Sequence, residues 1–433
     1  MSPEPENRRT EVVVTGLGLV GSEGIGPGPL AAALAAGRGA RRPMGPFGPI
    51  PRRPNGPTHA ATMTDEPLRR WVPPLVGRRM SPPSRFALAA ARLALEDAGL
   101  EPSEAADPAT GVALATSFGP MSFTQRLLDQ VFDEGPEAAS PFLFTECVAN
   151  APAAQVSIQC RLAGPNHTLC QREAGPLLAL ARGAQELRSG RAERMLVGVA
   201  EEVTPLIFAV LERFRALARP LPDLPEAARP FDRRRNGFTA SEGAAVLVLE
   251  SADAAASRGA IPRVRLAAWG SAFDPTAGQS GWGRGHGELA AAIARGLDRS
   301  GVPLSSIGRV VSGASGSRAG DRLEGRVLRA LMEHHGLAAA VPILAPKGVT
   351  GEYGGGFLAA ALLAGQGLAS EDGRFPDSAR GALAFGPTAG FERADPELAV
   401  TPHDGCALPP AGLTLVTSFA AGGAAAWSVL EAR

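Results

Sequence analysis

The sequence is organised around residues 164–176, which read GPNHTLCQREAGP. This run predicts a short strand, a tight bend and then a long Ala/Leu-rich helix that continues through Leu187. Pro176 stands where the helix should begin, and proline is tolerated in a first helical turn because the N–H that it lacks has no partner there. The bend therefore places Glu173 at a helix N-terminus, where unpaired N–H groups and the helix dipole favour an anion. A thiolate nucleophile is often placed at such a point, because the same field lowers the pKa of a cysteine. This chain has a carboxylate there.

Length and composition indicate a globular chain with about two domains. The 433 residues are 45% hydrophobic and 20% charged with a formal net charge of zero, which argues against a nucleic acid or an anionic membrane as a partner held by charge. Met1–Arg9 has no apolar core of the kind that a signal peptide needs, so we expect a cytoplasmic protein. The spacing of the four cysteines fits no metal site, and we expect neither a metal nor a cofactor.

Lys347 is the only lysine among 43 basic residues. In such an arginine-rich background, a lone lysine indicates a site that needs a compact ammonium group rather than a guanidinium fork. Chance is the alternative explanation, and the position of Lys347 in the motifs below makes it the weaker one.

The second half of the chain repeats patterns of the first half in the same order. Each half opens with an apolar strand, has an Ala-rich helix that ends at glycine, and closes with a Gly-Ala-Ala run before a strand. These features indicate an internal duplication of mixed α/β layers, with the join near Ser251–Ile261. The paired segments are Val12–Val14 with Val264–Ala268, Leu95–Pro102 with Leu297–Pro303, and Gly243–Glu250 with Gly423–Glu431.

The 164–176 segment resembles the nucleophile turn of β-ketoacyl synthases, the condensing enzymes of fatty acid and polyketide synthesis. Counted from the opening Gly-Pro, their catalytic cysteine falls on Glu173. The run Glu173-Ala174-Gly175 is similar to the Gln-Ala-Gly of chain length factors, the ketosynthase β subunits of type II polyketide synthases. The resemblance implies an α/β, thiolase-type fold with duplicated α-β-α-β-α five-layer architecture. Its two ketosynthase-like halves are expected at residues 1–256 and 257–433.

The resemblance also implies that the reactive groups of a ketosynthase are missing. Such an enzyme needs a thiolate and two neutral imidazoles, supported by a lysine. The first histidine position falls on Gly313, counted back from Asp321, and the second falls on Glu352, whereas Lys347 is retained. We therefore expect no catalytic residue, and Lys347 to balance Glu173, Glu352 or both in a buried remnant. The alternative is two separate, exposed acids that cap helices.

Two further residues near these motifs have expected places. Phe419 is predicted to belong to a gate-like loop of the site. Cys170 lies three residues before Glu173, and we interpret it as a buried thiol at the end of a strand. Three residues along a strand put His167 on the opposite face, so the two do not form a dyad.

Chain length factors pair with a catalytic ketosynthase and line the tunnel into which the chain grows on an acyl carrier protein with its phosphopantetheine arm. By this resemblance, the tunnel positions are Met121, Thr124 and Leu128. Their i, i+3, i+7 spacing puts them on one helix face. Met and Leu are flexible fillers, which is compatible with a reduced polyene product. An ordinary core face explains the same spacing equally well.

The predicted function is therefore that of a non-catalytic subunit of a β-ketoacyl-[acyl carrier protein] synthase, a heterodimer with the catalytic ketosynthase. Two alternatives stay open. One is a malonyl-carrier-protein decarboxylase that supplies primer. The other is a scaffold that docks carrier proteins without shaping a tunnel.

Overall fold

The computed structural model describes residues 10–46, 48, 52–63, 66–101, 104–354, 356, 385–408 and 412–432. Met1–Arg9, where the sequence has no signal-peptide pattern, lies outside these residues. Among the described helices, none has both the length and the hydropathy to cross a bilayer.

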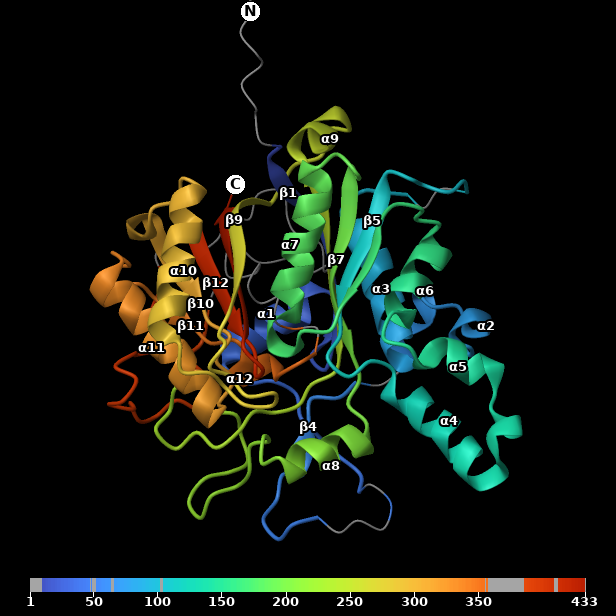
Figure 1. Ribbon diagram of the computed structural model, residues 1–433, viewed down its shortest axis with the longest axis horizontal. Helices are drawn as coiled ribbons and strands as arrows, with labels where there is room; N and C mark the ends of the chain where they lie inside the picture. The colour runs from blue at the N-terminus through green and yellow to red at the C-terminus, as the bar shows by residue number, and fades with distance from the viewer. Residues whose placement is uncertain are drawn as a thin grey trace, which may run out of the picture.

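Eleven of the described strands form one large sheet, which contains strands from both halves of the chain (Figure 1). The halves meet where β1 pairs with β9 through Val13 and Val14. The first half has β1 (Val12–Gly21), β2 (Gly24–Ile25), β5 (Thr110–Ala115), β6 (Asn166–Leu169), β7 (Arg194–Glu201) and β8 (Gly243–Ser251). The second half has β9 (Val264–Phe273), β10 (Ile307–Val311), β11 (Ile343–Leu344), β12 (Leu413–Phe419) and β13 (Ala424–Ala432), and a separate ribbon pairs β3 (Arg42–Pro43) with β4 (His59–Ala60).

Both halves have the same strand pattern, counted outward from the junction of β1 and β9. The order is β1, β8, β7, β5, β6 in one direction and β9, β13, β12, β10, β11 in the other. In each half the first two pairings are antiparallel and the next two are parallel. The two runs that begin with Gly-Ala-Ala form β8 and β13, which occupy the same place. The duplicated α/β fold is thus as predicted, whereas the boundary between residues 256 and 257 stays a prediction.

The helices complete a five-layer arrangement, α-β-α-β-α (Figure 1). α3 and α6 cover the outer face of the first half, and α10 and α11 cover that of the second half. α7 lies between the two halves, where it contacts β5 and β7 as well as β9 and β13. The helices are α1 (Pro27–Ala36), α2 (Pro74–Gly77), α3 (Pro82–Asp97), α4 (Met121–Glu134), α5 (Pro141–Cys147), α6 (Ala151–Cys160), α7 (Gly175–Arg188), α8 (Pro205–Arg213), α9 (Ala252–Ser257), α10 (His286–Arg299), α11 (Arg318–His334) and α12 (Lys347–Thr350). The 3₁₀ turns are η1 (Glu66–Arg70), η2 (Pro136–Ala138), η3 (Arg172–Ala174) and η4 (Leu304–Ser306).

The core explains two glycines in the first strand. A Cβ at Gly16 or Gly18 would overlap the carbonyl oxygens of Ala94 and Ala90, so glycine lets α3 lie directly on β1. In the centre of the molecule, Leu180 of α7 belongs to a buried cluster with side chains from strands of both halves. Burial of this central helix on both sides fixes the bend that precedes it, and with it Glu173.

Candidate functional site

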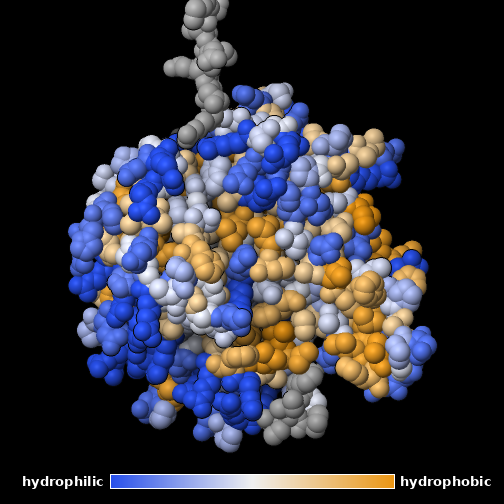
Figure 2. Space-filling view, viewed as in Figure 1, coloured by the Kyte–Doolittle hydropathy of each residue, from blue (hydrophilic) through white to orange (hydrophobic). Residues whose placement is uncertain are grey.

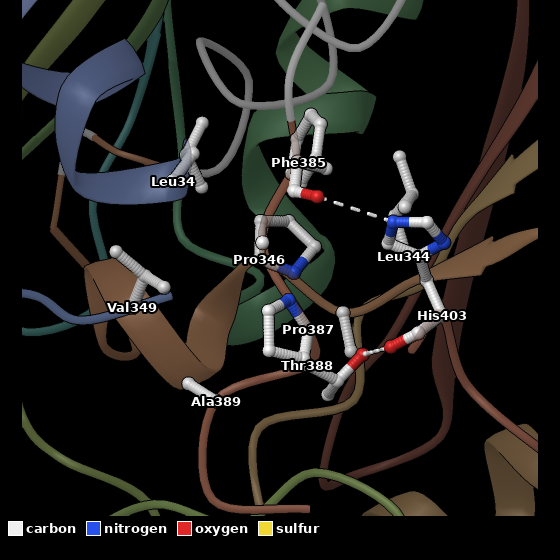
Figure 3. A pocket seen from close by; sticks show the side chains of 11 residues that line it. Leu34, Leu344, Pro346, Val349, Phe385, Pro387, Thr388, Ala389 and His403 are labelled. Carbon is white, nitrogen blue, oxygen red and sulfur yellow. Dashed lines mark hydrogen bonds between the residues drawn. The ribbon is translucent and has the colours of Figure 1, made fainter. Parts of the chain in front are cut away.

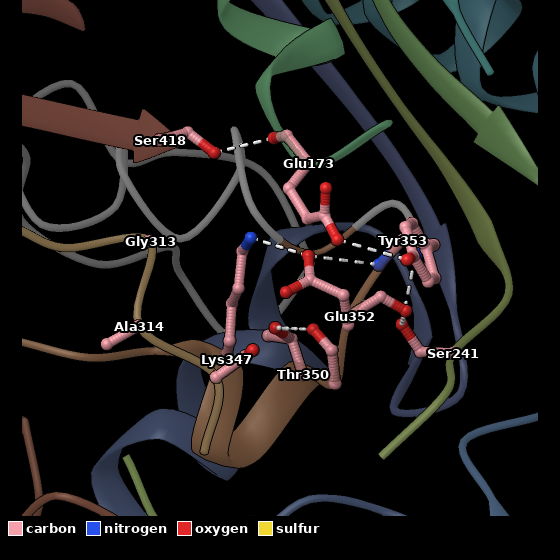
Figure 4. A network of polar contacts seen from close by, with 12 residues as sticks. Glu173, Ser241, Gly313, Ala314, Lys347, Thr350, Glu352, Tyr353 and Ser418 are labelled. Carbon is pink, nitrogen blue, oxygen red and sulfur yellow. Dashed lines mark hydrogen bonds and ion pairs between the residues drawn. The ribbon is translucent and has the colours of Figure 1, made fainter. Parts of the chain in front are cut away.

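The bend before α7 holds Glu173 in the interior, with the side chain 5% exposed. β6 ends at Leu169, η3 carries Glu173, and α7 begins at Gly175, followed by the predicted proline. The hydroxyl of Tyr353 donates to Glu173 Oε1 at 3.1 Å, and the backbone N–H of Ala421 donates to Oε2 at 3.2 Å. Ser418 donates to the Glu173 carbonyl oxygen at 2.5 Å (Figure 4). The carboxyl group is therefore held by neutral donors from the second half of the chain.

Burial, and to a smaller extent the charge of Glu352, raise the pKa of Glu173 from its ordinary value of 4.5 to about 7. Desolvation disfavours the charged form of a carboxyl group, and a second nearby carboxylate adds repulsion. Lys347 and the Tyr353 hydroxyl lower this pKa, but they do not offset burial. Near neutral pH, Glu173 is thus divided between its neutral and charged forms.

The corresponding turn of the second half carries Lys347 and Glu352. Lys347 Nζ lies 2.5 Å from Glu352 Oε1, and both side chains are almost completely buried (Figure 4). The backbone of Glu352 is fixed by Ser241, whose N–H and hydroxyl both donate to the Glu352 carbonyl oxygen. The structure therefore places the lone lysine directly on one carboxylate and leaves the other to hydrogen bonds. Exposed acids that cap separate helices, the alternative in the sequence analysis, do not match this burial.

Tyr353 is the site residue that the sequence analysis missed. Its ring packs edge-on between Phe118 and Phe238, with centroid distances of 4.9 and 5.5 Å. Burial raises the phenol pKa well above its ordinary value of 10, and the charges of Glu173 and Glu352 act in the same direction. Tyr353 is the only tyrosine of the chain and directly follows Glu352, so its rarity and its position were the available signal.

The first histidine position, Gly313, lies close to the end of β12. A Cβ there would approach the Thr417 carbonyl oxygen to 3.0 Å, so a side chain of histidine size requires this strand to shift. The Gly313 N–H donates to the buried Glu324, and the loop that follows is held by Asp321, whose carboxylate accepts from the N–H groups of Ser315 and Gly316. The Gly313 loop is therefore ordered without an imidazole.

All six histidines of the chain lie within the described residues, and none makes a hydrogen bond to Glu173, Lys347 or Glu352. His167 pairs with Glu186 at 2.9 Å, and Arg182 bonds the same ring nitrogen, which agrees with the expectation of no dyad with Cys170. His403 is 8% exposed and lies in a small, mainly apolar pocket, where its ring bonds the Phe385 carbonyl oxygen at 3.2 Å (Figure 3). Among the described residues, no cluster of His, Cys, Asp or Glu side chains could hold a metal ion.

Two placements differ from the sequence analysis. Cys170 is exposed rather than buried, because the chain leaves the sheet at Leu169 and the thiol belongs to the bend. Phe419 is the last residue of β12 and packs in the core of the second half instead of on a loop at the site. Side chains alternate along a strand, so Ser418 faces Glu173 and Phe419 faces away. The loop residue that reaches the site is Ala421.

A cavity of about 430 Å³ opens onto Glu173 and Tyr353. Its apolar wall includes Phe214 and Trp282, and Arg172 and Arg318 also line it. The cavity is large enough for a small ligand. The reactive group at its end is a carboxyl, which can bind protons and donors but lacks the nucleophilicity of a thiolate.

The three predicted tunnel residues all lie on α4. Met121 is partly buried and packs against the same cluster as Phe118 and Tyr353, whereas Leu128 is 45% exposed. Thr124 donates from its hydroxyl to the Pro120 carbonyl oxygen. Figure 2 shows hydrophobic residues on this side of the molecule, over α4 and α5. The exposed aromatic residues of this face are Phe132, Phe142 and Phe144.

Comparisons with known proteins agree with this fold. Residues 9–255 match the model of the β-ketoacyl synthase N-terminal domain. The β subunit of the tetracenomycin polyketide ketoacyl synthase of Streptomyces glaucescens is 34% identical, over 80% of this chain and 82% of that protein. The α subunit of the same synthase is 29% identical, over 89% and 88%.

A solved structure described as the ishigamide ketosynthase/chain length factor superposes with a TM-score of 0.82 at 28% identity. The match covers 98% of this chain and all of the other. The chain therefore belongs to the β-ketoacyl synthase family, with its relatives among the ketosynthase subunits and chain length factors of type II polyketide synthases.

Proposed function

We propose that this chain is the non-catalytic partner of a catalytic ketosynthase and that it shapes the tunnel that sets polyketide chain length. The observation that carries the proposal is the state of the three reactive positions. A buried glutamate stands at the nucleophile position, a glycine packed tightly against β12 stands at the first histidine position, and a glutamate bonded to Lys347 stands at the second.

With these residues at the three reactive positions, the chain cannot carry an acyl group as a ketosynthase does. Transfer of an acyl group from a thioester to Glu173 would form a mixed anhydride, which is far more reactive than the thioester it comes from. Condensation also needs donors that stabilise an enolate as malonyl loses carbon dioxide. A glycine and a glutamate stand at the two histidine positions, so neither position supplies such a donor. Because the chain is similar to both subunit types, these positions favour the β role.

The exposed hydrophobic face supports a partner subunit. Phe132 is 80% exposed, and Phe142 and Phe144 are each more than 60% exposed. Exposed hydrophobic surface of this kind marks protein interfaces. β6 is the last strand of the sheet beyond β5. Its outer edge has backbone N–H and C=O groups that could pair with a strand of the partner subunit. We propose the catalytic ketosynthase as the occupant of this face and an acyl carrier protein as the second partner, which brings the growing chain on its phosphopantetheine arm.

The tunnel role of Met121, Thr124 and Leu128 is tested by replacing tunnel residues with a larger side chain, which would fill part of the proposed tunnel. In the purified complex, Met121→Trp and Leu128→Trp should each shorten the main product by at least one two-carbon unit, measured by mass spectrometry. Ile261→Trp is the matched control, because Ile261 is 81% exposed and lies beyond α9, away from α4. Unchanged product length in both tunnel variants contradicts the proposal. A reduced polyene product stays a prediction, and so does the cytoplasmic location.

Malonyl decarboxylation is the second candidate, and one observation favours it. The cavity reaches a carboxyl group whose pKa is raised to about 7, so its neutral form repels a malonyl carboxylate less than a fixed anion does. Incubating the complex with malonyl carrier protein tests this candidate. Acetyl carrier protein that forms with the parent chain and is lost with Glu173→Ala supports it.

A scaffold without a tunnel predicts instead that a related subunit can replace this chain with no change in product length.

A further inference from the structure

Two adjacent buried carboxylates at the end of β7 have no part in the function proposed above. Glu201 is 0% exposed and Glu202 is 3% exposed. Glu201 accepts hydrogen bonds from the Thr116 hydroxyl at 3.2 Å and from the Ser117 N–H at 2.5 Å, with a longer contact to the Phe118 N–H. It therefore binds three consecutive residues of the loop that leads from β5 into α4.

Glu202 binds the next part of the same segment. Its Oε1 accepts from the Ser122 N–H at 2.8 Å and from the Ser122 hydroxyl at 3.1 Å. Ser122 is in the first turn of α4, and the N-cap residue of this helix, Pro120, provides no side-chain cap. Because the first N–H groups of a helix have no partner within it, a carboxylate from β7 supplies the missing acceptor and also complements the helix dipole.

α4 depends on these anchors because it has little burial of its own. None of its residues is fully buried, and it packs mainly against α5 and η2 at the edge of the molecule (Figure 1). A helix normally owes its place to the apolar face that it buries. Here the hydrogen bonds at its N-terminus tie it to the sheet.

Burying these two carboxyl groups costs folding free energy unless hydrogen bonds compensate for the lost water. Burial raises the pKa of Glu201 to about 8 and also raises the pKa of Glu202. The charge of Arg85 acts in the opposite direction on the pKa of Glu202, but it does not offset burial. The hydrogen-bond partners of the two carboxyl groups are backbone N–H groups and hydroxyls, which would be left unsatisfied by an apolar side chain at either position.

We propose that Glu201 and Glu202 are positioning residues that fix α4, and thereby the distance to which the growing chain extends. This inference rests on the proposed function, because it assumes that α4 lines the tunnel. The hydrogen bonds of Glu201 also connect to the candidate site. Glu201 binds the backbone of Phe118, and the ring of Phe118 packs on Tyr353.

The test uses the complex of this chain with the ketosynthase that co-purifies with it. Glu202→Ala should raise the ratio of off-length to main product roughly tenfold, the scale of one charge-assisted hydrogen bond. It should also speed hydrogen exchange of the first α4 amides by about the same factor. Glu202→Gln keeps an acceptor and should restore both readouts. Glu201→Gln, which is isosteric, should stay close to the parent chain if Glu201→Ala does not fold.

Glu250→Gln is the matched control, because Glu250 is equally buried but pairs with Arg258, whose guanidinium also bonds the end of α3, so neither residue contacts α4. It should lower stability without changing product length or α4 exchange. The proposal is overturned if Glu202→Ala leaves either readout unchanged, or if Glu250→Gln alters product length as strongly. Failure of the proposed function is a separate result, namely unchanged product length with both Met121→Trp and Leu128→Trp.

Discussion

The two acid-bearing turns of the molecule occupy equivalent places in its two halves but differ in how the acid is held. Glu352 has Lys347 at 2.5 Å, whereas Glu173 has a phenol and a backbone N–H. The ammonium group of the one lysine in the chain contacts Glu352. The difference shows that a buried acid can persist either through a cation or through a raised pKa, and that the two solutions respond differently to mutation and to pH.

The largest effect is expected from removing the cation. Lys347→Met leaves Glu352 buried without its partner, and breaking a buried pair in this way costs about 3–5 kcal/mol of unfolding free energy. The double variant Lys347→Met/Glu352→Gln removes both charges and should recover more than half of the loss. Urea unfolding of the isolated chain at pH 7 measures both. Equal stability of the single and double variants would show that the pair does not act as a unit.

The second prediction concerns pH at the other turn. The folded-state pKa of Glu173 is raised from 4.5 to about 7, so the folded chain binds a proton that the unfolded chain has lost between these values, and this group makes stability fall as pH rises through that window. Glu173→Gln removes the dependence. We expect it to be more stable than the parent at pH 8 by about 3 kcal/mol, with the gap closing toward pH 4.5.

Unfolding curves of the two chains at pH 5, 6, 7 and 8 check this expectation. Parallel stability profiles would contradict the assignment of a titrating group to Glu173. Glu173→Ala is a poorer comparison, because it also removes volume from the core and leaves the Tyr353 hydroxyl without an acceptor.

The smallest effect is expected from Tyr353→Phe, which keeps the ring and removes the donor. Loss of this hydrogen bond should cost about 1 kcal/mol and raise the pKa of Glu173 further. Because Tyr353 is the only tyrosine, an ultraviolet titration of the parent chain reports this phenol alone, and its midpoint should lie well above 10. A midpoint near 10 would show that the phenol is exposed to solvent.

The repeated sequence patterns predicted a duplicated α/β fold, and the resemblance to β-ketoacyl synthases implied its thiolase-type, five-layer form. The Gly-Ala-Ala runs at the starts of β8 and β13 and the helices α3 and α10, each followed by a glycine, have a local physical basis in strand and cap chemistry, so they identify equivalent elements. The same resemblance implied that Glu173, Lys347 and Glu352 gather in one place, because the turn after each half's last parallel strand faces the centre.

What the sequence did not show depends on long-range contacts. The bond of Tyr353 to Glu173 joins residues 180 positions apart, and no periodic pattern encodes it. The exposure of Cys170 and the inward side chain of Phe419 depend on where a strand ends to within one residue, since one residue reverses the face of a strand. The hydrogen bonds from Glu201 and Glu202 to the start of α4 could not be predicted either. In the sequence, two adjacent acids at the end of a strand look like ordinary surface residues.

The most direct test of the central claim is intact-mass spectrometry of both subunits during turnover of the purified complex with malonyl and acyl carrier proteins. The account predicts acyl adducts on the partner ketosynthase and none on this chain, whose Glu173 cannot hold a stable acyl group. A covalent acyl adduct on this chain, or chain elongation by this chain in isolation, would contradict it.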